Sequence, residues 1–340
     1  MDRLFFYPKL DLDLTHSPNP YIINLEKSLA PFFEIVNKDY NKGGVLEFYQ
    51  YLDKTDCYLF NWIEDLPIYR YGKIQVLFFV IFIILAKTFK KKIIWILHNK
   101  YSHFSKKNYW TDFMYWIMVK YSNTIITHSQ DGVDFITKRY KGHEKKVKYI
   151  IHPIEPLLTK DHFDLETFDL LIWGAIHPYK GIYEFLEFLN ENQPNNNIKI
   201  LIVGKCFDKN YYLKLAKFIN YNIIHLNEFK SLDDIAKLAQ TSKYVFFPYN
   251  SPSLLSSGSL MDSLRMGTRI LGPNSGSFKD LSYLSNIETY KCFDDVPQIL
   301  KANKISLHFN KLSEMNDFYK INSWSEFGPK FKKAYDLFHE

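Results

Sequence analysis

Residues 169–181 read DLLIWGAIHPYKG, a short apolar run followed by a glycine, a proline-containing loop and a Lys-Gly pair. The apolar run predicts a buried strand that ends at Gly174, and the amphipathic residues after Gly181 predict a helix. The stretch therefore predicts a strand, a loop and a helix in immediate succession, which is the repeating unit of a parallel α/β sheet.

The loop between this strand and this helix has the composition of an anion site. The first backbone N–H groups of a helix lack intrahelical partners, and the helix dipole places partial positive charge there. Lys180 adds a full positive charge and His177 adds a further hydrogen bond, an arrangement suited to a diphosphate. The simpler alternative is an ordinary strand-to-helix loop with a lysine on the surface.

The same alternation of short apolar runs and longer amphipathic runs extends along the whole 340-residue chain. The strands predicted before the quoted stretch are 4–7, 32–36, 57–60, 93–97, 124–127 and 147–151, with helices at 21–30, 74–90, 110–121 and 132–140. The strands predicted from the quoted stretch onward are 169–173, 198–203, 222–226, 244–247 and 269–272. A last amphipathic segment covers 324–338, and its main helix is expected after Gly328-Pro329.

The residues 152–156 (HPIEP) and the polar stretch up to Thr167 interrupt this alternation, and the pattern then begins again. Two complete series of strands and helices predict an α/β protein of two Rossmann-like, doubly wound domains facing a cleft. The predicted domains are 1–152 and 165–322. Such sheets bind ligands at the carboxyl ends of their strands, so the site residues are expected in the loops there.

A second polar loop, within FFPYNSPSLLSSGSLMDSLRMG at 246–267, also lies between a predicted strand and a predicted helix. Tyr249 ends the strand, and Ser256-Ser257-Gly258-Ser259 leads into the helix. Serine hydroxyls and an unobstructed glycine backbone at a helix N-terminus suit phosphate or sugar oxygens. Asp262 lies one turn further on, where it either accepts hydrogen bonds from ribose hydroxyls or satisfies backbone donors in a Ser-x-x-Asp capping box that begins at Ser259.

Together the two loops resemble the donor-binding half of family 4 and related glycosyltransferases of the GT-B type. The resemblance rests on the Gly-loop-Lys-Gly pattern of 174–181 and on the later PY-x(n)-SG-x(n)-D-x-L-x-x-G block. Residues 231–238 are similar to the helix that lies between these motifs in the family. The resemblance covers 165–290 well and extends to the N-terminal half through Asn19-Pro20-Tyr21 and His98-Asn99.

The resemblance implies transfer of a sugar from a nucleotide diphosphate donor, a UDP- or GDP-sugar, with no cofactor besides this substrate. Lys180 would contact the diphosphate, residues 226–229 would flank the base, and Asp262 would bind the ribose. The final helix, 324–340, would pack back on the N-terminal, acceptor-binding domain. The full set of expected donor-binding residues is Gly174, His177, Lys180, Gly181, Asn227, Glu228, Phe229, Tyr249, Ser256, Ser257, Gly258, Ser259 and Asp262.

Two positions depart from the family pattern. Typical retaining members have an arginine directly after the strand glycine, where this chain has Ala175. They also carry two glutamates eight positions apart, and here Leu254 stands for the first and Asp262 for the second. The sequence therefore leaves open whether the transfer retains or inverts the anomeric configuration.

The acceptor and the catalytic base are expected in the N-terminal half. His98 and His103 follow a predicted strand, and histidine is the natural general base near neutral pH. Asp13, with its neighbour Asp11, is the carboxylate alternative in the loop after the first strand. A histidine at a strand end is as often a structural residue, so these alternatives stay open.

Metal and disulfide chemistry are not expected. The Asp-x-Asp pattern at 11–13 follows a strand rather than opening a nucleotide-binding loop, which disfavours a metal-dependent GT-A enzyme. The cysteines, Cys57, Cys206 and Cys292, lie far apart without ligand spacing, which indicates a reducing cytoplasm. The N-terminus lacks the pattern of a signal peptide.

The chain has a formal net charge of +6, and part of this charge follows an apolar segment. Residues 74–86 (IQVLFFVIFIILA) are about a third too short for a membrane-spanning helix. They predict a buried helix or one that dips into a membrane interface. The lysines of 87–92 suit an anionic membrane surface or a phosphate-bearing substrate, the alternative being a solvated surface. Nucleic acid is not expected, because no recognition motif accompanies the charge.

The leading interpretation is a cytoplasmic, peripherally membrane-associated glycosyltransferase (a hexosyltransferase) that acts on a glycan or lipid-linked acceptor in cell-surface polysaccharide assembly. A second interpretation is a nucleotide-sugar epimerase on the same double fold. A third is a nucleotide-sugar-binding module that has lost catalysis, for which the missing first glutamate at Leu254 gives a reason.

Overall fold

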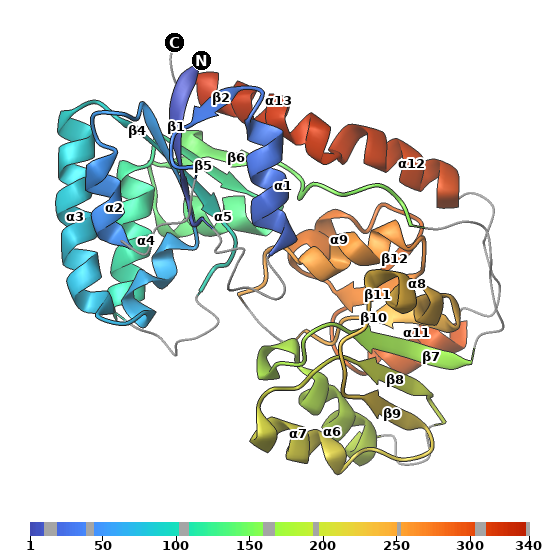
Figure 1. The fold of residues 1–340 in the computed structure, drawn as a ribbon. Helices are drawn as coiled ribbons and strands as arrows, with labels where there is room; N and C mark the ends of the chain where they lie inside the picture. The colour runs from blue at the N-terminus through green and yellow to red at the C-terminus, as the bar shows by residue number, and fades with distance from the viewer. Residues whose placement is uncertain are drawn as a thin grey trace. The chain divides into compact units, whose positions relative to one another are not determined.

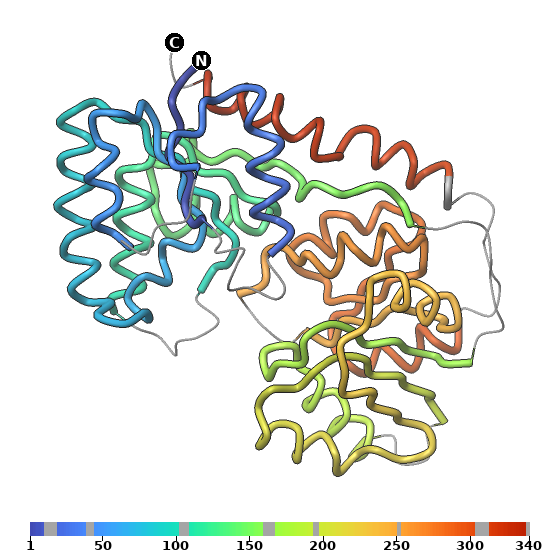
Figure 2. Tube along the Cα trace, in the orientation of Figure 1, coloured from blue at the N-terminus to red at the C-terminus, as the bar shows by residue number. Residues whose placement is uncertain are grey.

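The structure, a computed structural model, describes residues 1–9, 19–38, 44–101, 109–158, 167–192, 197–249, 253–302 and 311–337. The chain divides into two compact units (Figures 1 and 2). The N-terminal unit consists of Met1–Pro153 and Asn322–Glu340, and the C-terminal unit is Ile154–Ile321. Each unit is built around a six-stranded sheet.

The N-terminal unit has the strand order β2-β1-β3-β4-β5-β6, and every neighbouring pair is parallel. The strands are β1 (Asp2–Tyr7), β2 (Phe33–Ile35), β3 (Cys57–Asn61), β4 (Lys92–Leu97), β5 (Thr124–Thr127) and β6 (Val147–Tyr149). The helices are α1 (Pro20–Leu29), α2 (Val45–Gln50), α3 (Gly72–Thr88), α4 (Tyr109–Tyr121), α5 (Gln130–Arg139) and α13 (Trp324–Asp336), with 3₁₀ helices η1 (Ile63–Ile68) and η2 (Glu144–Lys146).

Helices cover both faces of this sheet, which is why its strands are apolar on both sides. Successive side chains of a strand point to opposite faces. Phe6 of β1 belongs to a buried cluster with α1 and α13, whereas Phe5 packs against Phe48 of α2, with ring centres 5.5 Å apart. Tyr58 of β3 points the same way as Phe5 and contacts Phe82 of α3.

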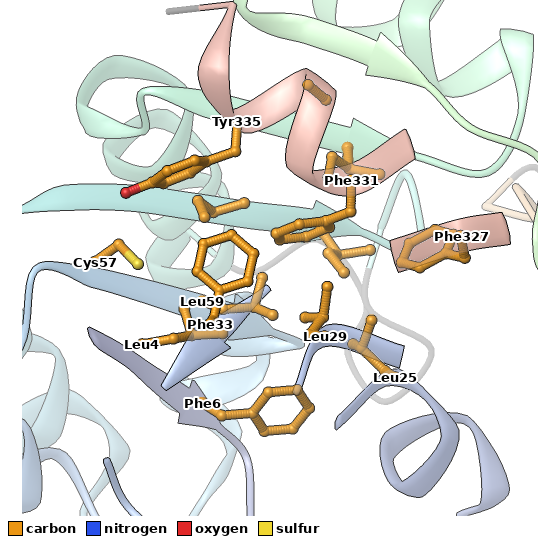
Figure 3. Packing of buried hydrophobic residues seen from close by; sticks show 14 of the residues in the cluster. Leu4, Phe6, Leu25, Leu29, Phe33, Cys57, Leu59, Phe327, Phe331 and Tyr335 are labelled. Atoms are coloured by element: carbon orange, nitrogen blue, oxygen red, sulfur yellow. The ribbon is translucent and has the colours of Figure 1, made fainter. Parts of the chain in front are cut away.

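The C-terminal helix α13 completes the first of these faces (Figure 3). Phe331 and Tyr335 pack edge-on against Phe33 of β2, with ring centres 5.8 and 5.1 Å away. The helix crosses α1 closely, since a Cβ on Gly328 would lie 2.3 Å from the carbonyl oxygen of Ser28. Segments from the two ends of the sequence therefore share one core.

The sequence prediction for this helix was wrong in one respect. The main helix was expected to begin after Gly328-Pro329, but α13 begins at Trp324 and runs through both residues. Proline costs a helix one hydrogen bond and some steric strain. Here the helix is held on the sheet by buried side chains on both sides of the proline, among them Phe327 and Phe331, so packing outweighs the local preference.

The C-terminal unit has the strand order β12-β11-β10-β7-β8-β9, again all parallel. The strands are β7 (Phe168–Trp173), β8 (Ile200–Val203), β9 (Ile223–Leu226), β10 (Ser242–Phe246), β11 (Ile270–Pro273) and β12 (Ile287–Tyr290). The helices are η3 (Pro178–Lys180), α6 (Ile182–Asn192), α7 (Lys209–Ala216), α8 (Leu232–Gln240), α9 (Gly258–Arg265), α10 (Gly276–Asp280), α11 (Asp295–Ala302) and α12 (Lys311–Asn322), whose last residue belongs to the N-terminal unit.

The order of the strands in the C-terminal sheet reverses between β7 and β10. From β7 the chain adds β8 and β9 on one side, then returns to add β10, β11 and β12 on the other. Ligands of doubly wound sheets bind at such a reversal, outside the carboxyl ends of the strands. The two loops singled out in the sequence follow these two strands, β7 and β10.

The predicted strands are all present, with ends shifted by up to two residues. The edge strand β12 was missed, as was the short helix α2. The apolar segment 74–86 lies within α3, a helix that buries Val76, Phe79 and Phe82. Among the described residues, no helix is long and apolar enough to cross a membrane.

Candidate functional site

The loop after β7 approaches neighbouring backbone closely at its first residue. Gly174 has φ +93°, a conformation that other residues rarely adopt. The loop after β8 lies against it, since a Cβ built on Gly204 would fall 1.9 Å from the Gly174 carbonyl oxygen. An isolated bridge between Ile176 and Cys206 joins the same two loops. The β7 loop is thereby fixed at the carboxyl edge of the sheet.

Lys180 lies at the end of η3 in this loop, and its side chain is folded inward. The residue is 5 % exposed, and its Nζ donates to the carbonyl oxygen of Trp173 at 3.4 Å. No ion pair with a carboxylate is found for it among the described residues. Burial lowers the pKa of its amine to about 8. A buried ammonium without a counter-charge is costly, unless an anion binds beside it.

The loop after β10 leads into α9, whose N-terminus is capped by a serine. Ser257 is the N-cap residue, and its hydroxyl accepts from the N–H of Leu260 at 3.3 Å. The Tyr249 hydroxyl lies 3.5 Å from the same oxygen, and burial raises the pKa of this phenol. The hydroxyl oxygen of Ser256 is buried and has no hydrogen-bond partner among the described residues, and a Cβ on Gly258 would meet open space.

The two loops converge at Gly174. A Cβ built on this glycine would lie 3.1 Å from Nζ of Lys180 and 3.8 Å from Oγ of Ser259. An ammonium, a serine hydroxyl and a glycine backbone from segments almost 80 positions apart therefore meet at the switch point between β7 and β10. These groups are positive or can donate hydrogen bonds, as an anion site requires.

Asp262 does not form the capping box that the sequence allowed. The helix is capped by Ser257 rather than Ser259, and the Asp262 carboxylate pairs with Arg265 at 3.2 Å. Arg265 also pairs with Glu155 at 3.0 Å. Burial raises the pKa of Asp262, against the lowering effect of Arg265. The capping alternative is thus wrong, and a ribose contact remains a prediction.

The first turn of α6 offers less to an anion than the sequence suggested. The N–H of Tyr183 already donates to the Tyr211 hydroxyl at 3.2 Å. Gly181, with φ +71°, ends η3 directly before the helix. His177 stacks on Tyr179, with ring centres 5.7 Å apart. Burial and the nearby Lys180 lower the pKa of His177, so the imidazole is neutral at neutral pH.

The loop after β9 carries the residues that were expected to flank the base. Asn227 accepts from the N–H of Cys206 at 2.8 Å and so holds the neighbouring loop. Glu228 pairs with Lys230 at the surface. Phe229 is exposed and lies 5.7 Å, centre to centre, from exposed Phe207. Because β8 and β9 are the first and second strands beyond β7, this aromatic pair lies about 5–10 Å from the β7 loop along the sheet edge.

Sequence reasoning missed Phe207 in this pair. Its signal was available, since it stands four residues after the carboxyl end of a strand in a doubly wound sheet. An exposed aromatic pair offers a stacking surface to a planar ring. The contact with Phe229 arises only because β8 and β9 are adjacent strands in the sheet.

In the N-terminal unit, His98 directly follows β4 and is 8 % exposed. Its Nε2 lies 3.0 Å from Oδ1 of Asn61, and the amide of Asn61 donates to the Tyr7 carbonyl. This orientation assigns the hydrogen to Nε2 of His98 and leaves Nδ1 as the basic nitrogen. The ring stacks on Trp62, with centres 4.1 Å apart.

His98 belongs to a cluster that the sequence did not reveal. His128 follows β5 and His152 follows β6, and both lie within 6 Å of Tyr21, centre to centre. The Tyr21 hydroxyl donates to Nε2 of His128, while Nδ1 of His128 donates to the Ile150 carbonyl. We refer to His98, His128 and His152 as the histidine cluster.

Burial keeps the histidine cluster neutral. It lowers the pKa of His128 to about 3 and that of His152 to about 4, and it holds the pKa of His98 well below its usual value. For His98 and His128 the neighbouring rings contribute in the same direction, because a charged ring there would be repelled by them. His98 is therefore unprotonated at neutral pH, with one ring nitrogen able to accept a proton.

The other candidate bases, Asp13 and His103, lie outside the described residues, as does Asp11. Among the residues that are described, no group of three or more His, Cys, Asp or Glu side chains could hold a metal ion. Leu254, at the position of the family's first glutamate, is buried and apolar.

No protein-family model matches the sequence, and no curated protein matches it. Solved structures do match. HepE of Anabaena, in complex with UDP and glucose, has a TM-score of 0.68 at 10 % identity, covering 99 % of this chain and 100 % of that one. The lipopolysaccharide outer core galactosyltransferase WaaB has a TM-score of 0.65 at 13 % identity, with 98 % and 100 % covered. A Rickettsia africae glycosyltransferase has a TM-score of 0.65 at 11 % identity, with 99 % and 98 % covered.

These matches extend over nearly the whole length of each chain. They confirm the predicted fold class, because two doubly wound α/β sheets of this kind are the architecture of GT-B glycosyltransferases. The chain has the GT-B fold.

Proposed function

We propose that this chain is a glycosyltransferase of the family 4 type that binds a nucleotide diphosphate sugar at the switch point of its C-terminal unit. The observation that supports the proposal is the environment of Lys180. This lysine is buried, close to Gly174 and Ser259, and without an ion-pair partner among the described residues. A diphosphate would supply the missing negative charge.

The proposed chemistry follows from where charge develops during transfer. The bond between the sugar and the diphosphate lengthens, so negative charge grows on the departing phosphate while the sugar ring becomes positive. Lys180, the Ser259 hydroxyl and the N–H groups at the start of α9 are fixed donors that would stabilise this phosphate without a metal ion. Fixed donors need little reorganisation, and this is how an enzyme lowers the barrier.

The loops after β8 and β9 offer a position for the nucleotide base. Phe207 and Phe229 are exposed in the loops after β8 and β9, further along the same sheet edge than Lys180 in the loop after β7. We propose that the base stacks there, with the ribose between base and diphosphate and within reach of Asp262. HepE, which shares the fold, was solved with UDP-glucose, so a UDP-sugar is the first donor to test.

The acceptor side of the proposal rests on His98. Its neutral imidazole has an acceptor nitrogen, Nδ1, and it follows a strand end in the N-terminal unit. We propose that it takes the proton of an acceptor hydroxyl on a glycan or lipid-linked sugar, with Asp13 and His103 as alternatives. We further propose that the chain acts in cell-surface polysaccharide assembly, at the cytoplasmic face of a membrane.

Ligand-induced stabilisation tests the donor site. Unfolding temperatures of the full chain are measured with UDP-, GDP-, ADP- and dTDP-sugars, since a ligand of the native state raises them. One donor should stabilise wild type, and Lys180→Met should abolish the effect. The matched control, Lys217→Met, removes an exposed lysine and should leave it intact. Equal stabilisation of both variants would show the site to be misassigned.

One observation favours the inactive module as a second candidate. Leu254 is buried and apolar where the family has a glutamate near the reacting carbon. Mass spectrometry of donor and acceptor mixtures separates the possibilities. A glycosylated acceptor supports the transferase, isomerised donor without an acceptor indicates an epimerase, and an unchanged donor that still binds indicates the module.

A further inference from the structure

The outward face of α3 is apolar along most of its length. Val76, Phe79 and Phe82 point into the core, but the opposite side is not polar. Five large apolar residues there are each at least 40 % exposed. They recur at helical spacing, and we call them the α3 stripe: Ile74, Leu77, Phe78, Ile81 and Ile84. A helix that is apolar all round is usually buried in a core or a membrane.

The surroundings of the α3 stripe are basic. Lys73 lies exposed at its beginning and Lys90 at its end, and Arg70 is exposed directly before the helix. On α4, which contacts α3, Trp116 is 43 % exposed and the Lys120 ammonium lies 4.7 Å from its ring centre. Aromatic rings with lysines beside them are typical of the boundary between lipid and water.

Among the described residues, exposed carboxylates are rare around α3. The helix α3 contains no acidic residue. Three helices contact α3: α2, α4 and η1. Glu47 of α2 is buried, as are Glu64 and Asp65 of η1. Asp112 of α4 is paired with Arg139. Within the part of the chain that the structure describes, the face therefore combines exposed apolar side chains with basic side chains that form no ion pair. Both properties match a bilayer that contains anionic lipids.

We propose that the α3 stripe is a docking surface for an anionic membrane, with α3 lying in the plane of the lipid headgroups. The helix has 17 residues, about 25 Å in length, and one side of it is occupied by the core, so it lies on the bilayer rather than crossing it. Figure 1 shows α3 at the outer side of the helices α2 to α4.

A second copy of the chain is the competing occupant of this surface. In a two-fold symmetric pair the same patch meets itself. Lys73 and Lys90 of one helix would then approach lysines of the other, with no carboxylate on α3 to compensate. The charge of the α3 stripe's borders therefore favours anionic lipid over self-association.

The experiment is flotation of the full chain with vesicles of phosphatidylcholine alone or mixed with phosphatidylglycerol. Wild type should float with the mixed vesicles, and binding should fall as sodium chloride is raised. The triple variant Leu77→Ser, Phe78→Ser, Ile81→Ser should bind at least about tenfold more weakly, because three apolar side chains leave the interface. The matched control, Leu213→Ser, Ile219→Ser, Ile224→Ser, changes side chains of comparable exposure in the C-terminal unit and should float like wild type.

A second variant keeps the proposal testable if the triple variant does not fold. Lys73→Glu with Lys90→Glu should reduce flotation on mixed vesicles while leaving the apolar face intact. Absence of flotation by wild type, or equal flotation on neutral vesicles, overturns the proposal. So does a wild-type dimer that the triple variant converts to a monomer without any vesicle binding.

The proposed docking surface and the proposed donor site can be tested independently. Stabilisation by a nucleotide-sugar is measured on the same variants without vesicles and should match wild type. Failure of wild type to dock, with donor binding retained, refutes only the membrane surface. Docking without any donor binding refutes only the proposed function.

Discussion

The ammonium of Lys180 donates to the carbonyl oxygen of Trp173 at 3.4 Å, at the end of the strand that precedes its own loop. This long hydrogen bond folds the side chain back over the carboxyl end of β7. The chain thereby holds a positive charge at the reversal of strand order, where doubly wound sheets bind ligands.

The pH dependence of anion binding should follow from this burial. Desolvation lowers the pKa of Lys180 to about 8, so the free site loses its charge as pH rises above that value. The dissociation constant of the stabilising nucleotide-sugar should be flat below pH 8 and then rise, by up to tenfold per pH unit. Calorimetric titration between pH 6.5 and 9.5 measures it.

The lowered pKa of Lys180 should weaken anion binding at high pH, but it should raise the free energy of unfolding there. The amine of an unfolded lysine has a pKa near 10.4, so between about 8 and 10.4 the unfolded chain binds one more proton than the folded chain. The contribution of Lys180 to the free energy of unfolding therefore rises with pH across this window. Lys180→Met should remove this rise. An unchanged slope would contradict the burial of an unpaired ammonium.

Gly174→Ala should weaken donor binding through the space that its methyl group takes. The methyl would lie 3.1 Å from Nζ of Lys180 and 3.8 Å from Oγ of Ser259. The positive φ adds a backbone cost of about 1–2 kcal/mol for any residue with a Cβ. We expect lower stability together with at least tenfold weaker nucleotide-sugar binding, measured by calorimetric titration.

Gly142→Ala is the matched control for that substitution. Gly142 has φ +87°, close to that of Gly174, but a Cβ there would meet nothing within 4 Å. This variant should lose a similar amount of unfolding free energy in urea and bind the nucleotide-sugar normally. Equal binding losses in both variants would attribute the effect to backbone strain and not to the site.

The sequence predicted local features of the proposed donor site better than its assembly. Gly174 and Lys180 are close along the chain, so a strand-loop-helix pattern sufficed to find them. Their approach to Ser259 depends on β10 pairing with β7 rather than with β9, and no local pattern encodes that order. The contact between Phe207 and Phe229 arises in the same way, from two loops on adjacent strands.

Other differences come from packing that overrides local preference. The strand β12 has only four residues, and its two middle side chains are half-buried at the sheet edge, so it lacked the apolar run that marks the others. Pro329 predicted a helix start, but buried Phe327 and Phe331 hold one continuous helix through it. The histidine cluster was hidden because its members follow three different strands.

The histidine cluster should make the N-terminal unit sensitive to acid. Unfolded histidine titrates near pH 6.5, whereas burial lowers the pKa of His152 to about 4 and that of His128 to about 3. Between these values the unfolded chain binds more protons, so stability is lost as pH falls below 6.5. Each histidine contributes up to about 1.4 kcal/mol per pH unit.

Buried Glu64 acts in the opposite direction, since burial raises its pKa to about 8 and its contribution falls as pH rises. A difference measurement separates the two. His152→Gln should reduce the dependence of the unfolding free energy on pH between 6.5 and 4.5 by about one proton, whereas His143→Gln, outside the cluster, should not. Equal slopes in all three proteins would contradict a neutral buried His152.

The packing of α13 should make the C-terminal end of the chain essential for the N-terminal unit. Phe331 is fully buried and contacts Phe33 of β2, so Phe331→Ala should lower the free energy of unfolding by about 3–5 kcal/mol. Leu337→Ala, at an exposed position just after the helix, should cost less than about 0.5 kcal/mol. Urea unfolding monitored by circular dichroism measures both variants.

Because Phe331 lies in the other unit from Lys180, stabilisation by a nucleotide-sugar should persist in folded Phe331→Ala. A loss of donor binding equal to that of Lys180→Met would mean that α13 supports the donor site as well as its own core.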